Sequence, residues 1–301
     1  MSNLRGPGHD MPPPAWACHS SALPVYTAVT APIPASCRSH TPMLFDWLRK
    51  DRFPDALRAF GLHRCAMSGE SLCIGLAPNS EYSLLPLQNI PAAPASVCFF
   101  DAPLQADLVH AFVSSPRAAT VAHLVIGTSH DYAKNRARGY DMTQAVAALK
   151  GTRLPMLKRL SLGDMEMLYN GHRLFGTIGD ISHVFQIAPA LIELRLHGHF
   201  TLTGPSRHPQ LAALEVEVDD IGVTGGPLNQ QTVSNLMLSD FPSLTCCDLD
   251  LSEDPPEVRY SIPPEFFSPQ RSPLLRSLAI NSLTAEAVIQ LEKWKELRGI
   301  E

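Results

Sequence analysis

The apolar and polar positions of the chain repeat one pattern between residue 119 and residue 280. Each copy follows the form Pro-x-Leu-x-x-[Leu/Cys]-x-[Leu/Ile/Val], so three apolar positions keep a fixed spacing after a proline. The copies begin at residues 119, 155, 189, 209, 242 and 273, and the first has alanine in place of the proline. Successive copies are 36, 34, 20, 33 and 31 residues apart. Self-similarity at such spacings indicates a repeat architecture.

Each copy ends in a pattern that predicts a β-strand. Its last two apolar positions are separated by one residue, which is the alternation of a strand with one buried face. The proline before them ends the preceding helix or loop, because proline cannot continue the hydrogen bonds of a helix. The predicted strands are centred on residues 124–126, 160–162, 194–196, 214–216, 247–249 and 278–280.

Helix-compatible stretches separate most of the predicted strands. They cover residues 140–149, 181–187, 229–238 and 285–297. The 20-residue unit that begins at Pro189 leaves no room for a full helix. We therefore expect units of strand, turn, helix and return, whose strands stack as a parallel concave sheet with the helices outside. The last helix is expected to cap the final strand.

The repeated frame resembles leucine-rich repeats, and the longer units are similar to the ribonuclease-inhibitor-like branch. The stretches 161–165, 179–182 and 191–198 (Ser-Leu-Gly-Asp-Met, Gly-Asp-Ile-Ser and Leu-Ile-Glu-Leu-Arg-Leu-His-Gly) resemble an uncharacterised group of bacterial cytoplasmic leucine-rich-repeat proteins. The resemblance covers residues 103–283. It departs from the repeat consensus in its irregular unit length and in having only Asn281 near the asparagine position after the strand. Such a family implies an α/β solenoid that binds partners, and it supplies no catalytic residues.

The N-terminal third lacks this frame. Residues 1–42 mix Pro, Ser, Ala and Thr without an apolar period, which predicts a disordered leader, and Met43 is an alternative start. Residues 43–100 are predicted to form a small α+β module or cap. It would contain a helix over 53–61 and short strands over 71–75 and 96–100. Residues 101–301 would form the solenoid.

Composition narrows the possible functions. The net charge is -5 and the pI is near 6.2, which argues against a nucleic-acid binder, because such domains are usually strongly basic. No stretch approaches the length of about 18 apolar residues that a membrane span needs. The 7 cysteines form no Cys-x-x-Cys pair, so we expect reduced thiols in a cytoplasmic protein.

Strand alternation predicts which side chains point away from the core. They fall into three columns across the six strands. The first column contains His123, Arg159, Glu193, Ala213, Cys246 and Ser277; the second contains Val125, Ser161, Arg195, Glu215, Asp248 and Ala279; the third contains Gly127, Gly163, His197, Glu217, Asp250 and Asn281. We expect these columns to line the concave face.

Charged residues gather in one part of these columns. The candidate partner-binding residues are Arg195, His197, Glu215, Glu217, Asp248 and Asp250. Because neighbouring strands lie about 4.8 Å apart, the four carboxylates would form a compact acidic patch, with Asp219 and Asp220 at its edge. One interpretation is a docking surface for a basic segment of a protein partner. The other is a solvated strand face whose acids keep an exposed sheet soluble.

Other candidate sites are weaker. A metal site at His197, His199 and His208 is disfavoured, because no nearby acid is placed to complete the ligand set. The glycines of residues 171–179 lack the lysine of a phosphate-binding loop. Cys247 occupies an apolar position and Cys246 is expected on the concave side. No catalytic residue, cofactor or metal is therefore predicted.

The sequence predicts a non-enzymatic protein-protein interaction scaffold that binds its partner on the concave repeat surface, with no nucleic acid and no membrane. Two alternatives stay open. The chain could be a secreted bacterial effector with leucine-rich repeats, or a hydrolase or transferase whose activity lies in residues 43–100.

Overall fold

The computed structural model describes residues 65–68, 71–74, 90–100, 106–127, 140–163, 176–218, 228–251, 259–268 and 271–300. The chain divides into two compact units, Met1–Asp46 and Trp47–Glu301, and every described residue belongs to the second. The leader predicted over 1–42 and the helix predicted over 53–61 lie outside the described residues.

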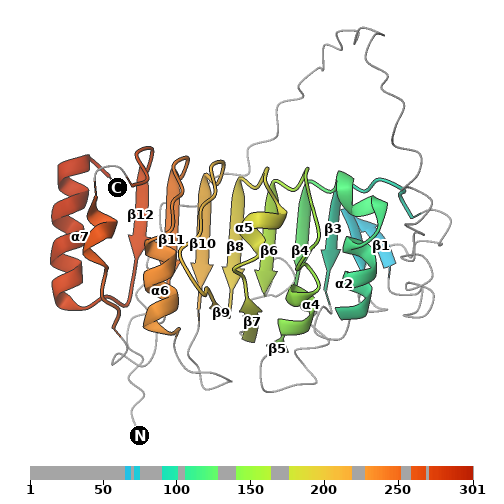
Figure 1. The fold of residues 1–301 in the computed structure, drawn as a ribbon, viewed down its shortest axis with the longest axis horizontal. Helices are drawn as coiled ribbons and strands as arrows, with labels where there is room; N and C mark the ends of the chain where they lie inside the picture. The colour runs from blue at the N-terminus through green and yellow to red at the C-terminus, as the bar shows by residue number, and fades with distance from the viewer. Residues whose placement is uncertain are drawn as a thin grey trace, which may run out of the picture. The chain divides into compact units, whose positions relative to one another are not determined.

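One large sheet organises the described part of the chain (Figure 1). Its strands are β1 (Cys65–Ser68), β2 (Ser71–Ile74), β3 (Ser96–Phe99), β4 (His123–Ile126), β6 (Arg159–Gly163), β8 (Glu193–His197), β10 (Ala213–Glu217), β11 (Cys246–Asp250) and β12 (Ser277–Ile280). They lie in the sheet in this same order. The β1–β2 pair is antiparallel, and every other pair of neighbours is parallel. An open α/β sheet built in chain order is what stacked repeats produce.

The six strands predicted from the repeat frame are confirmed, and so is their register. For example, Leu160 of β6 pairs with Leu194 of β8, and Leu194 pairs with Leu214 of β10. The strands expected over 71–75 and 96–100 are also present, as β2 and β3. Both join the same sheet as β4, so the sheet continues across residue 100.

A smaller parallel sheet, which the repeat pattern does not predict, contains β5 (Tyr140–Asp141), β7 (Gly176–Asp180) and β9 (His199–Thr201). Gly198 joins β8 directly to β9 with a φ of 121°, a conformation that favours glycine. A Cβ at this position would lie 2.5 Å from the carbonyl oxygen of Gly176. The turn between the two sheets therefore requires glycine here.

Four of the helices lie over one face of the large sheet (Figure 1). They are α2 (Ala106–Val113), α4 (Thr143–Ala147), α5 (Val184–Ile187) and α6 (Gln230–Met237). Their buried side chains pack with the strand leucines in one continuous core. Short 3-10 helices cover Pro116–Thr120 (η5) and Pro264–Phe267 (η7). None of the described helices is long and apolar enough to cross a membrane.

Two of the predicted helices are shorter than expected. The helix predicted over 140–149 begins at Thr143, because Tyr140 and Asp141 pair with β7 and the Asp141 carboxylate accepts the Thr143 amide at 2.9 Å. The helix predicted over 181–187 begins only at Val184, because the Asp180 carboxylate accepts the Ser182 amide in the turn before it. In both units a strand-end aspartate turns the chain, and the helix follows.

The two predicted C-terminal helices are confirmed. The Asn229 side chain caps α6 by accepting the Gln231 amide at 2.7 Å. The last helix, α7 (Ala285–Arg298), starts at a Thr284 cap and ends at Gly299, where φ is 63°.

Helix α7 packs at the β12 end of the structure through an aromatic cluster (Figure 1). The Trp294 ring lies 5.3 Å from the Phe266 ring and 6.0 Å from the Phe267 ring, measured between centroids. The Arg298 guanidinium stacks on Trp294 at 4.9 Å and donates to the carbonyls of Arg271 and Ser272. These contacts fix the helix as the expected cap.

Candidate functional site

The strand registers bring the six predicted site residues onto three adjacent strands. In the second column Arg195, Glu215 and Asp248 are direct neighbours across β8, β10 and β11. In the third column the direct neighbours are His197, Glu217 and Asp250. The apolar residues between them, such as Leu196 and Leu249, are buried in the core. The polar residues of β6, β8, β10 and β11 that alternate with the buried leucines are called the polar face below: Arg159, Ser161, Glu193, Arg195, His197, Glu215, Glu217, Cys246, Asp248 and Asp250.

The accessible part of the columns is narrower than the sequence suggests. Val125 is 1% exposed and Gly163 is buried, although both were expected to line an open surface. In the same second column, Cys73 and Cys98 on β2 and β3 are also buried. On β8 and β11, by contrast, Arg195 and Asp248 are exposed. The solvent-facing section therefore covers β6 to β12 and stops short of β4.

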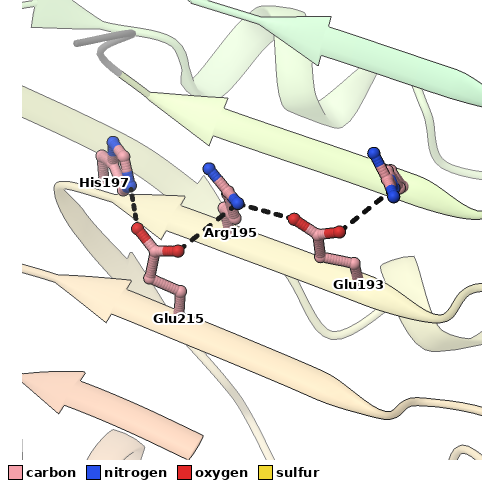
Figure 2. A network of polar contacts seen from close by, with 5 residues as sticks. Glu193, Arg195, His197 and Glu215 are labelled. Carbon is pink, nitrogen blue, oxygen red and sulfur yellow. Dashed lines mark hydrogen bonds and ion pairs between the residues drawn. The ribbon is translucent and has the colours of Figure 1, made fainter. Parts of the chain in front are cut away.

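A chain of ion pairs connects β6, β8 and β10 across this section (Figure 2). Glu193 accepts from Arg159 Nε at 3.1 Å and from Arg195 Nε at 2.7 Å. Arg195 Nε also lies 3.3 Å from Glu215 Oε2. The other oxygen of Glu215 lies 3.3 Å from His197 Nε2. Each carboxylate therefore bridges two basic side chains.

This network changes the acidic patch that the sequence predicts. Glu215 was expected to be one of four clustered carboxylates, but it is bonded to Arg195 and His197. Arg159 and Glu193 were absent from the candidate list, although both stand in the first predicted column. Long side chains can bond to a residue two positions away on the same strand or to a residue on the neighbouring strand. Grouping the residues by column does not predict these contacts. Exposed pairs of this kind contribute at most about 1 kcal/mol each, so the network orders the face more than it stabilises the fold.

The acid-rich part of the polar face lies on β10 and β11. Partial burial raises the pKa of the Asp248 carboxyl, and the charges of Glu215 and Asp250 raise it further. Asp250 accepts a hydrogen bond from the Asn281 side-chain amide, whose oxygen accepts the Leu251 amide at 2.7 Å. Asp248 forms no ion pair among the residues that the structure describes. The negative electrostatic potential at Asp248 therefore favours binding of a cation.

At the other end of the network, Arg159 of β6 lies beside β4. His123 of β4 is in register with Arg159. Partial burial lowers the pKa of His123, and the Arg159 charge lowers it further. The polar face therefore runs from Arg159 on β6 to an acidic edge on β11.

The weaker candidates do not come together as a site. Gly198 separates His197 in the large sheet from His199 in the small one, and His208 is buried with Nε2 at 3.0 Å from the Ala188 carbonyl. Within the described ranges, no three His, Cys, Asp or Glu side chains are placed to hold a metal ion. Cys247 is buried and Cys246 is exposed on the polar face, as expected. Gly171 and the acids Asp219 and Asp220 lie outside the described residues, whereas Gly176 and Gly179 form part of β7.

Comparison with models of known families and with curated proteins finds no match. Among solved structures, the chain is similar to a Bacteroides fragilis protein from a structural-genomics programme, with a TM-score of 0.33 and 18% sequence identity. The similarity covers 57% of this chain and 47% of that one, so this chain spans about half the length of the protein it matches.

Proposed function

We propose that the chain is a leucine-rich-repeat solenoid that acts as a non-enzymatic scaffold and binds a protein partner on its polar face. The observation that carries the proposal is the in-register charged surface of β6, β8, β10 and β11. Its side chains come from consecutive repeats, so one contiguous surface draws on four units of the chain. Stacked repeats commonly use such extended surfaces for binding.

The charge of this surface favours a basic partner segment. The polar face contains five carboxylates and two arginines. Both arginines already bond to carboxylates on β8 and β10, which leaves the acidic edge on β11. Burial and, after it, the charges of Glu215 and Asp250 raise the pKa of the Asp248 carboxyl, and a lysine or arginine placed there would offset this repulsion. Complementary charge of this kind supplies specificity and a fast, salt-sensitive association.

The ordered network supports recognition in a second way. Arg195 is held by Glu193 and Glu215, so its guanidinium has a fixed position before a partner arrives. A preorganised side chain loses less conformational entropy on binding than a free one. A partner carboxylate near Arg195 and a partner cation near Asp248 would therefore set the orientation of the bound segment.

A charge-reversal comparison tests this function. The full chain, an Asp248→Lys/Asp250→Lys variant and a Glu292→Lys/Glu296→Lys variant would each be used for affinity capture from cells of the native organism. The control reverses two exposed carboxylates of α7 and so changes the net charge equally. We expect the captured partner to be reduced about tenfold or more only in the β11 variant, because facing like charges cost several kcal/mol. Equal capture by all three proteins would contradict the proposal.

A further inference from the structure

Two cysteines lie side by side in the sheet at a distance from the polar face. Cys73 of β2 is in register with Cys98 of β3. The side chains are 3% and 8% exposed, and neither cysteine is in a disulfide. They belong to the second column, on the sheet side opposite Leu72 and Ile74. No part of the proposed binding function uses them.

The register of the two strands brings the thiols into contact. Adjacent strands lie about 4.8 Å apart, which falls inside the range of Cα separations, about 4.4–6.8 Å, that disulfides span. The two thiols share a hydrogen bond, and this bond, followed by burial, raises the pKa of Cys98. Cys73 Sγ also lies 3.8 Å from the Ser71 carbonyl oxygen.

The other described cysteines supply a contrast. Cys246 and Cys247 are neighbours in sequence, so their side chains point to opposite faces of β11. Cys247 is as well buried as Cys98, but its in-register neighbours are Leu214 and Leu278. Burial is therefore common to both sites, whereas a facing thiol is specific to Cys73 and Cys98 among the residues that the structure describes.

We infer that Cys73 and Cys98 form a cross-strand thiol pair that closes to a disulfide by exchange with a small disulfide such as oxidised glutathione. The Cys98 thiolate attacks one glutathione sulfur, which forms a mixed disulfide and releases one glutathione thiolate. The Cys73 thiolate then attacks the Cys98 sulfur and releases the second. Both cysteine protons end on the two glutathione molecules, so each oxidised glutathione is reduced to two thiols as one protein disulfide forms.

The spacing of β2 and β3 also determines how easily the disulfide is reduced. In-register neighbours on parallel strands have Cβ atoms about 4.8 Å apart, beyond the roughly 3.5–4.5 Å of a relaxed disulfide. Closure must therefore draw β2 toward β3, and strained disulfides of this kind are readily reduced. Because the raised pKa of Cys98 keeps the thiolate scarce, closure accelerates about tenfold per pH unit in alkaline solution. The pair is thus expected to close slowly and to reopen easily.

Peptide mapping of the full chain tests the inference. The native protein is incubated with oxidised glutathione at about pH 8.5 and at about pH 9.5. Reaction of exposed Cys246 shows that the reagent is active, and samples are then taken over several days because the buried pair closes slowly. Free thiols are then alkylated after unfolding, and the digest is analysed by mass spectrometry. The expected result is one linked peptide pair joining residues 73 and 98, lost on treatment with dithiothreitol, while Cys247 stays fully alkylated. The Cys98→Ser variant should show no link and an alkylated Cys73.

Two results would overturn the inference. One is complete alkylation of Cys73 and Cys98 at both pH values and at every time point, in samples in which Cys246 has been oxidised from the start. The other is a link from either residue to a different cysteine. The outcome is independent of partner binding, so failure here leaves the proposed function of the polar face untouched.

Discussion

Gly163 controls the approach of two strands beneath the polar face. It is the last residue of β6 and has a φ of 115°. A Cβ built on it would lie 1.9 Å from the carbonyl oxygen of His197 and 2.9 Å from the His197 Cβ. Gly163→Ala therefore forces the β8 backbone to move at the residue whose ring contacts Glu215.

Alanine substitutions at two other glycines distinguish the two causes of the expected loss of stability, which are backbone strain and steric collision. Gly151 has a φ of 76° but open space around its Cβ position, so an alanine there meets backbone strain alone. This strain costs about 1–2 kcal/mol. Gly204 has neither a positive φ nor a close neighbour, so alanine there is expected to be neutral or to stabilise by about 0.4–1 kcal/mol. Gly163→Ala combines the strain with a backbone collision, and we expect it to lose about 3 kcal/mol or more.

Urea unfolding followed by circular dichroism measures these differences as shifts of the midpoint. The expected order of stability is Gly204→Ala, then Gly151→Ala, then Gly163→Ala. The Gly163 variant should also weaken partner binding, because His197 moves. If Gly163→Ala unfolds at the same urea concentration as Gly204→Ala, the close approach of β6 and β8 at this turn is wrong.

Two further predictions concern buried side chains. Burial lowers the pKa of His208, and likewise of His123 and His183, so below about pH 6.5 the unfolded chain binds more protons than the folded one. The urea midpoint should therefore fall between about pH 7.5 and about pH 5, and His208→Gln should reduce the fall; an unchanged pH dependence would refute this role of His208. Trp294→Ala should destabilise by about 3–5 kcal/mol in thermal or urea unfolding, because it removes the aromatic contacts of α7, while Leu297→Ala, at 79% exposure, should change stability by about 0.5 kcal/mol or less. Equal losses at the two positions would contradict the packing of the cap.

The repeat frame predicts the large sheet well because two local signals agree in each unit. A proline ends the preceding element, and apolar residues two positions apart then fix which side of the strand is buried. In the unit from Pro189, for example, Leu194 and Leu196 are both fully buried while Arg195 between them is exposed. Since the side-chain period of a strand is two, a correct strand also gives the correct face and register.

The small sheet escapes prediction for a physical reason. Strands β5 and β9 have only two and three residues, and pairing with β7 holds them in place rather than their own sequence preference. Tyr140 therefore carries a helical signal yet forms part of a strand, with its hydroxyl donating to the His197 carbonyl. Such short strands depend on tertiary contacts that no local window contains.

The candidate site was also predicted only in part. Alternation correctly places the charged residues together, but it does not predict which of them pair. That Arg195 bonds to Glu193 of its own strand and to Glu215 of the next depends on side-chain rotamers in the folded sheet. Nor does alternation predict that Val125 is buried while Ala279, in the same column, is exposed.

Site-specific photo-crosslinking tests the central claim most directly. A photoreactive amino acid would replace Ala279, which is exposed beside Asp248 in the second column, or Ala147, which is exposed on α4. Because both positions are exposed alanines, the yields can be compared after irradiation in cells of the native organism. The proposed function predicts a partner adduct from position 279 and little or none from position 147. An equal yield from both positions, or an adduct from position 147 alone, would contradict binding on the polar face.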